Sequence, residues 1–322
     1  LEVWALVENI EYKDSIDMYS ILSSTTHRKT LIDNLVNEAL QYGIDGINVD
    51  FEQISLDCGE HYIEFIRELS IPCRANGIVL SVDNYVPSDY TAFYNRAEQA
   101  LFADYVVIMA YDEHYAGSPE AGSVASIGFV TDGVENTLKE VPANQVILGM
   151  PFYTRVWSET PVESDSTATD ETDTTVDYEL SSYATNMTEV QKLISANGVQ
   201  PVWLDDIGQN YVEYQNGGVN YKIWIEDATS LEKKLTVMDT YGLAGGSFWK
   251  LGFLYLGYHY QIYQLVFEND PETQIQVQPI NRFISPTVCE YNIETNCGIF
   301  YEKKNRIAYG TLCDSLCLCP RP

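Results

Sequence analysis

Short apolar segments of five to eight residues alternate along much of the chain with longer segments of helical periodicity. Most of the short segments are apolar on both faces, which is typical of strands covered by helices on both sides. They predict strands at 3–7, 46–51, 78–85, 105–111, 146–152 and 246–251. Because strand–helix alternation is typical of parallel βα units, we expect an α/β fold built on a parallel sheet.

Three of the helices between these strands are marked by their apolar spacing. The repeating positions are Leu31, Ile32, Leu35, Val36, Ala39 and Leu40, then Tyr62, Ile63, Ile66 and Leu69, then Leu231, Leu235 and Met238. Gly43 and Gly242 follow two of these patterns, where a left-handed residue often ends a helix. Thr229 and Glu232 have the spacing of a capping box, so we expect the third helix to begin there.

The alternation stops between Trp157 and Asp227. Residues 158–182 hold eight Asp or Glu and no Lys or Arg, which predicts a solvated acidic loop. A helix near 188–196 and strand-like segments at 202–204, 211–214 and 221–225 follow. We interpret this region as a small α+β insertion without an independent core. Periodicity fades after about residue 266, where a Cys-rich tail begins.

The charge of the chain narrows the classes of partner. With 47 acidic and 18 basic residues, the formal net charge is −29, which disfavours nucleic acid and anionic membranes as partners. Solubility alone is the alternative explanation for the charge. No segment approaches the roughly 18 apolar residues of a membrane span. The sequence begins at Leu1 without a signal-peptide pattern, so we expect a processed chain or a segment of a longer one.

The seven cysteines fall into two groups. Five lie within the last 34 residues, at Cys289, Cys297, Cys313, Cys317 and Cys319. This density predicts disulfides, within the tail or to a partner chain, and an oxidising compartment; a zinc site is the alternative, but the tail has no His. Cys58 and Cys73 flank a helical segment that holds them about 18 Å apart at roughly 1.5 Å per residue, so we expect free thiols.

The segment 45–52, Asp-Gly-Ile-Asn-Val-Asp-Phe-Glu, carries the strongest chemical signal. On a strand, Asn48, Asp50 and Glu52 share one face, and the apolar residues between them share the other. In a closed barrel the polar face would point inward at the carboxyl-terminal mouth, where active sites lie. The alternative is a buried structural network neutralised by Arg or Lys.

This segment resembles the D-G-x-D-x-D-x-E motif of glycoside hydrolase family 18, with Asn48 where the family usually has its first inner Asp. Three further segments resemble family motifs in the expected order: 109–112 (M-x-Y-D), 149–155 (G-x-P-x-Y-x-R) and 246–249 with Trp249. The residues of these motif segments are similar to those of a bacterial branch of the family, the spore-cortex and peptidoglycan-lytic N-acetylglucosaminidases. The resemblance covers about residues 1–256.

The resemblance implies a (β/α)8 TIM-type barrel in which the segment 3–7 corresponds to the third strand. The first two βα units are then missing, and we expect a further upstream segment, another chain or the tail to cover the gap. The implied organisation is 1–157 for barrel strands 3–7, 158–227 for the insertion, 228–266 for the last helix and strand 8, and 267–322 for the tail.

The resemblance also implies a retaining mechanism in which the substrate's acetamide replaces the enzyme nucleophile. Glu52 would be the general acid and base, Asp50 would orient the acetamide and raise the pKa of Glu52, and Tyr111 would bind the acetamide carbonyl. The implied substrate-binding residues are Asn48, Met109, Asp112, Tyr153, Arg155 and Trp249. Arg155 could instead neutralise Asp50 or Asp112, and Asp83 and Asn84 are secondary candidates for sugar contact.

The resulting prediction is an extracytoplasmic hydrolase of β-1,4 bonds next to N-acetylglucosamine in peptidoglycan or chitin-like glycan. We expect no cofactor and no metal site, since His27, His61, His114 and His259 form no cluster in the sequence. A non-catalytic glycan-binding protein of the same fold is the alternative, although the acid Glu52 is present. A structural envelope protein is a third, supported only by the tail.

Overall fold

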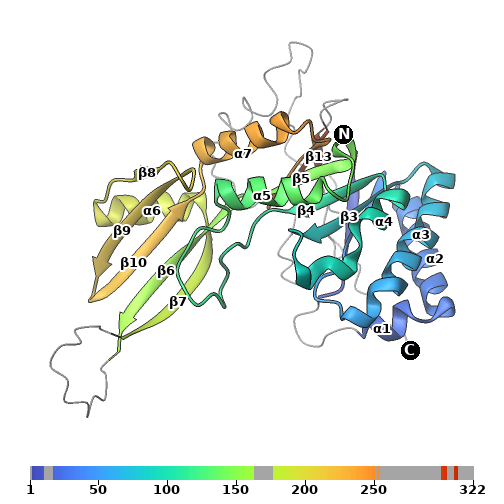
Figure 1. Cartoon of the computed structure of the whole chain (residues 1–322), viewed down its shortest axis with the longest axis horizontal. Helices are drawn as coiled ribbons and strands as arrows, with labels where there is room; N and C mark the ends of the chain where they lie inside the picture. Colours follow the sequence, from blue (N-terminus) through green and yellow to red (C-terminus); the bar gives the residue numbers. More distant parts are fainter. Residues whose placement is uncertain are drawn as a thin grey trace, which may run out of the picture.

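The computed structural model of the chain describes residues 2–10, 17–162, 177–250, 253, 299–302 and 308–310. Within these residues one sheet has eight strands in the order β1-β2-β3-β4-β5-β11-β12-β13 (Figure 1). Its first six members pair in parallel: β1 Trp4–Glu8, β2 Gly46–Asp50, β3 Val79–Tyr85, β4 Tyr105–Met109, β5 Val146–Pro151 and β11 Gly245–Trp249. All six strands predicted from the apolar segments are thereby confirmed.

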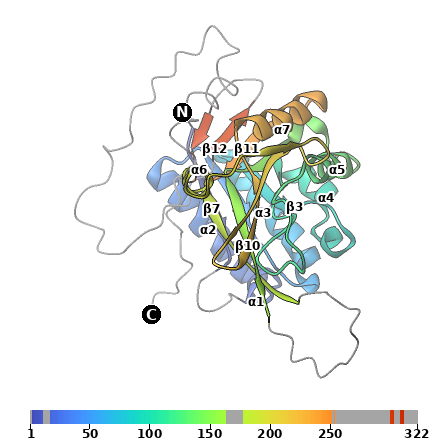
Figure 2. The same ribbon diagram turned by 90° about the vertical axis from the view of Figure 1, so that its left-hand side faces the viewer.

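Helices connect these strands and cover one face of the curled sheet, as Figures 1 and 2 show. They are α1 Met18–Leu22, α2 Thr25–Tyr42, α3 Gly59–Asn76, α4 Arg96–Phe102, α5 Ile127–Thr137 and α7 Ala228–Thr240, with short 3-10 turns at Leu56–Cys58, Asp89–Tyr94 and Ala143–Gln145. The main core lies between sheet and helices and contains Ile47, Val49 and Phe51 of the 45–52 segment. Asn48 and Asp50 therefore point to the opposite, inner face, as the period-2 pattern predicted.

The helix boundaries show one correction. Gly43 ends α2 in the left-handed conformation with φ 66°, as expected. Helix α7, however, is capped by Asp227 and not by Thr229: the Asp227 carboxylate accepts from the Thr229 and Ser230 N–H groups, and the Ser230 hydroxyl accepts from the Asp227 N–H. Asp is as good a cap as Thr, and its box with Ser230 begins two residues earlier.

The insertion forms a second sheet of antiparallel strands in the order β7-β6-β10-β9-β8, at the end of the molecule away from α2 and α3 (Figure 1). Its elements are β6 Tyr153–Pro161, β7 Tyr178–Asn186, α6 Met187–Asn197, β8 Val202–Leu204, β9 Gln209–Asn216 and β10 Val219–Ile225. The expected lack of a separate core is wrong, because Val156, Val190, Ile194, Val212, Ile223 and Ile225 form a buried cluster of their own. Part of the predicted acidic loop is also strand; residues 163–176 lie outside the described residues.

Two short strands of the tail, β12 Ile299–Glu302 and β13 Ala308–Gly310, join the main sheet. Strand β12 pairs antiparallel with β11, on the edge of β11 that does not meet β5. Of the three expected covers for the gap, an upstream segment, another chain or the tail, the tail therefore pairs with this edge. The five tail cysteines and His259 lie outside the described residues. Cys58 and Cys73 are buried and free, as predicted, and no helix in the described part of the chain could cross a membrane.

Candidate active site

A pocket of about 160 Å³ opens where the carboxyl ends of the parallel strands meet. Seven of the nine residues predicted for the site line it: Asp50, Glu52, Met109, Tyr111, Asp112, Tyr153 and Trp249. The other lining residues are Glu8, Asp83 and Tyr85. Carboxylates and aromatic rings that lie on or directly after six strands therefore share one concave site, which is the usual arrangement at the carboxyl-terminal face of a barrel.

Glu52 lies two residues beyond the end of β2, and its backbone is fixed by Asn9. The Asn9 amide donates to the Glu52 carbonyl oxygen at 2.8 Å, and the Asn9 Oδ1 accepts from the Glu52 N–H at 2.7 Å. The carboxylate of Glu52 accepts a hydrogen bond of 2.7 Å from the Tyr85 hydroxyl. Both backbone polar groups of Glu52 are therefore hydrogen-bonded to Asn9, which fixes the direction in which the Glu52 side chain enters the pocket.

The pKa of Glu52 is raised, first by burial and then by the charge of Asp112, while the hydrogen bond from Tyr85 opposes the shift. The predicted direction is confirmed. Burial is the largest cause and Asp112 adds a charge effect. The charge repulsion between Asp50 and Glu52, which is the predicted cause, is also present and raises the pKa of Asp50. A raised pKa keeps the Glu52 proton available toward neutral pH, as a general acid requires.

Asp50 lies beneath Glu52, is 7% exposed, and its Oδ1 has no hydrogen-bond partner among the described residues. Its pKa is raised well above the usual range by burial, then by the charges of Asp83, Glu52 and Glu8. None of the residues described as lining the pocket is Lys or Arg. The alternative of a neutralised structural network therefore has no support in the pocket wall.

Asn48 does not line the pocket but supports it from below. It is fully buried, and its amide donates to the Ser81 hydroxyl at 2.9 Å and to the Asp83 carboxylate at 2.7 Å. Burial raises the pKa of Asp83 to about 7, against the effect of the hydrogen bond from Asn48.

In the described part of the chain no group of three or more His, Cys, Asp or Glu could hold a metal ion.

Replacing Asp83 by asparagine is expected to raise the melting temperature at pH 8 and to change it little at pH 4. Because the pKa of Asp83 in the folded state, about 7, lies above its unfolded value near 4, the folded state binds more protons between these values. The contribution of the Asp83 side chain to stability therefore falls as pH rises between these two pKa values. Melting curves of wild type and Asp83→Asn from pH 4 to 8, with the exposed Asp57→Asn as control, measure this. A gain that is independent of pH would contradict it.

The remaining wall of the pocket is aromatic. The rings of Tyr111 and Tyr153 meet edge to face with centroids 6.2 Å apart, and the Tyr153 hydroxyl donates to Asp112 at 2.6 Å. A side chain at Gly149 would approach the Ile108 carbonyl oxygen to 2.8 Å, so glycine is needed for this wall. Burial raises the pKa of Tyr111 well above its usual value, which leaves a neutral hydroxyl that can donate a hydrogen bond.

Arg155 does not reach the pocket. Its guanidinium donates to the Ser182 hydroxyl at 3.1 Å and lies 5.9 Å above the ring of Trp157, inside the insertion. Arg155 is therefore not among the residues that line the pocket, and the described residues show no ion pair between it and Asp50 or Asp112. Tyr153 and Arg155 share one face of β6, but Arg155 lies two residues further along the strand, where it contacts Ser182 and Trp157 of the insertion sheet.

Glu8 and Tyr85 are the site residues that the sequence did not single out. Glu8 ends β1 and lies directly opposite Asp50 in the parallel register, and Tyr85 ends β3. Each is a polar residue at the carboxyl end of a predicted strand, which is the signal that could have identified them.

A parallel sheet of barrel type with acid groups and aromatic rings gathered at its carboxyl end is an arrangement that suits a glycoside hydrolase. The family described as "Glycosyl hydrolases family 18" matches residues 12–253, three quarters of the chain, and the chain belongs to this family. The prediction from the four motifs is confirmed.

Individual relatives agree with this assignment. "Uncharacterized glycosylase YvbX" from Bacillus subtilis is 27% identical over 78% of this chain and 71% of its own length. A "Cortical fragment-lytic enzyme" from the same organism is 27% identical over 76% of this chain but only 55% of its own length. The structure of the Bacillus cereus spore cortex-lytic enzyme SleL superposes with a TM-score of 0.71 at 25% identity, covering 85% of this chain and 60% of SleL.

Proposed function

We propose that this chain hydrolyses β-1,4 bonds next to N-acetylglucosamine in peptidoglycan or chitin-like glycan, with retention of configuration at the anomeric carbon. The observation that carries the proposal is the placement of Glu52 above the buried Asp50 in a pocket without a basic residue among its described lining. The relatives named for lysis of the spore cortex support the peptidoglycan arm and an extracytoplasmic place of action.

In the first step Glu52 gives its proton to the glycosidic oxygen while the bond from that oxygen to the anomeric carbon breaks. The acetamide oxygen of the same sugar attacks the anomeric carbon and forms a cyclic oxazolinium ion. Asp50, on the same face of β2, accepts from the acetamide N–H and stabilises the positive charge. Its unpartnered Oδ1 is an acceptor available for that N–H.

Tyr111 and Asp112 assist this step from β4 and its following loop. The neutral Tyr111 hydroxyl donates to the acetamide oxygen and orients it toward the anomeric carbon. Asp112, itself held by Tyr153, accepts from hydroxyl groups of the bound sugar, and Trp249 offers an apolar face for the ring. In the second step the Glu52 carboxylate removes a proton from water, which opens the oxazolinium ion from the face that the leaving group vacated.

The test is incubation of the wild-type chain with N-acetylglucosamine oligomers and with purified peptidoglycan, followed by measurement of new reducing ends. Proton NMR during the first minutes reports the anomer that is released, and retention gives the β-anomer before mutarotation. Binding of both glycans without new reducing ends would replace the proposal with the glycan-binding alternative. Release of the α-anomer would mean inversion of configuration and would exclude the substrate-assisted mechanism.

A further inference from the structure

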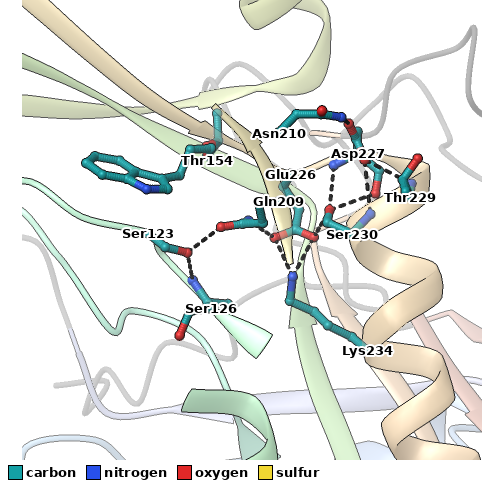
Figure 3. Close-up of polar contacts among 12 residues, drawn as sticks. Ser123, Ser126, Thr154, Gln209, Asn210, Glu226, Asp227, Thr229, Ser230 and Lys234 are labelled. Atoms are coloured by element: carbon teal, nitrogen blue, oxygen red, sulfur yellow. Dashed lines mark hydrogen bonds and ion pairs between the residues drawn. The ribbon is translucent and has the colours of Figure 1, made fainter. Parts of the chain in front are cut away.

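A buried polar network joins the insertion sheet, helix α7 and the loop between β4 and α5, residues 110–126 (Figure 3). At its centre is the ion pair between Glu226 and Lys234, whose atoms lie 2.8 and 2.9 Å apart. Both side chains are 1% exposed. Glu226 also accepts from the Ser230 hydroxyl at 2.6 Å and from the Gln209 amide at 2.9 Å.

Gln209 carries this network to the β4–α5 loop. Because its amide nitrogen donates to Glu226, its Oε1 faces the other way and accepts from the hydroxyl of Ser123. A second link lies beside the first: the indole nitrogen of Trp157 donates to the Gly122 carbonyl oxygen at 2.9 Å. The insertion therefore holds the loop at two adjacent residues, from β9 and from β6.

The held end of the loop is bound to the end that enters the pocket. The Glu113 N–H donates to the Val124 carbonyl oxygen at 2.8 Å. The Glu113 carboxylate accepts from the Ser126 N–H at 2.7 Å and from its hydroxyl at 3.0 Å. Asp112 precedes Glu113 directly and has a φ of 57°, a conformation that a non-glycine residue adopts when its surroundings impose it.

We propose that Ser123 and Gln209 are positioning residues, which together with the Glu226–Lys234 pair hold the β4–α5 loop so that Asp112 faces Glu52. The inference rests on the proposed function, since it concerns how the general acid is prepared. It adds to that function a role for the insertion, whose described residues supply no carboxylate to the pocket lining.

The charge of Asp112 raises the pKa of Glu52, and this gives the position of the loop a measurable consequence. Loss of the Ser123 contact would loosen the loop around Asp112, which keeps its hydrogen bond from Tyr153, so the pKa of Glu52 would fall by less than on removal of the Asp112 charge. The other titratable groups around Glu52 come from β1, β2, β3, the following 3-10 turn, the first residues of the β4–α5 loop, and β6; they are Glu8, Asp50, Asp83, Tyr85, Tyr94, Tyr111 and Tyr153. Loosening the loop beyond residue 111 leaves their backbone in place.

The experiment compares Ser123→Ala, Asp112→Asn and the double variant by the pH dependence of kcat/KM on N-acetylglucosamine oligomers. The alkaline limb reports the pKa of the protonated acid in the free enzyme. We expect Asp112→Asn to move this limb to lower pH, Ser123→Ala to move it in the same direction by less, and the double variant to match Asp112→Asn alone. Gln209→Leu serves as a second variant with the expected behaviour of Ser123→Ala.

Ser70→Ala is the matched control, because Ser70 is also buried and donates to a backbone carbonyl, that of Arg67, away from the loop. It should lower the melting temperature without moving the limb. If Ser123→Ala also lowers only the melting temperature, or if its shift adds to that of Asp112→Asn, the positioning role is overturned.

A second readout does not need activity. NMR titration of the Glu52 carboxyl in ¹³C-glutamate-labelled protein, assigned with Glu52→Gln, should show the same order of pKa values among the variants. An inactive wild type would end the proposed function, whereas unequal titration of Glu52 would still support the positioning of Asp112, and equal titration would overturn it.

Discussion

Replacing Glu52 by glutamine is expected to lower glycan hydrolysis about 100- to 10,000-fold, the usual contribution of a general acid and base. The amide has nearly the same shape, but it cannot give a proton to the glycosidic oxygen or take one from water. Its carbonyl oxygen can still accept from the Tyr85 hydroxyl, and the backbone bonds to Asn9 do not involve the side chain. Binding through Asp50 and Tyr111 should therefore persist while turnover is lost.

Stability provides the internal control for that result. Because the folded-state pKa of Glu52 is raised, its ionised form destabilises the fold above the unfolded value, and the destabilisation grows as pH rises. Glu52→Gln should therefore melt at the same temperature as wild type or higher near pH 8. Glu60→Gln, an exposed change at the start of α3, should alter neither property. Equal cleavage by wild type and Glu52→Gln would show that another group is the acid.

The sequence predicts those residues of this site that lie together on one strand. Asn48, Asp50 and Glu52 alternate with core residues over six positions, 47–52, so their common face follows from the geometry of a strand alone. Glu8 joins them only through the register of β1 against β2, which places it opposite Asp50 from 42 positions away. Register between parallel strands is decided by the packing of the whole sheet, and no local pattern reports it.

Two errors have the same physical origin. Arg155 follows a family motif, but it lies in β6, which pairs with β7 and β10, so its guanidinium contacts residues of the insertion sheet. The separate core of the insertion was missed because its six members come from four elements, each contributing only one or two apolar residues. Patterns within one element cannot show a cluster assembled in this way.

The ion pair between Glu226 and Lys234 is the feature whose loss should most damage the fold. Replacing Lys234 by methionine is expected to lower the free energy of unfolding by about 3–5 kcal/mol at pH 8, the usual cost of leaving one member of a buried pair uncompensated. Methionine fills a similar volume, so the loss would report the charge and not a cavity. Lys192→Met is the matched control: Lys192 pairs with Glu189 at 2.6 Å on the surface of α6, and such exposed pairs contribute about 0.3–0.5 kcal/mol.

The pH dependence of Lys234→Met identifies the cause. Burial already raises the pKa of Glu226, and Lys234 is the largest influence that opposes the shift. Without Lys234 the pKa of Glu226 rises further, so the folded variant holds a proton that the unfolded chain releases above pH 5. Its stability therefore falls as pH rises, and chemical denaturation should show a smaller deficit against wild type at pH 5 than at pH 8. Adding Glu226→Gln, which keeps an acceptor for Ser230, should recover most of the loss at pH 8. A deficit that is equal at both pH values and unchanged in the double variant would assign the damage to packing around residue 234.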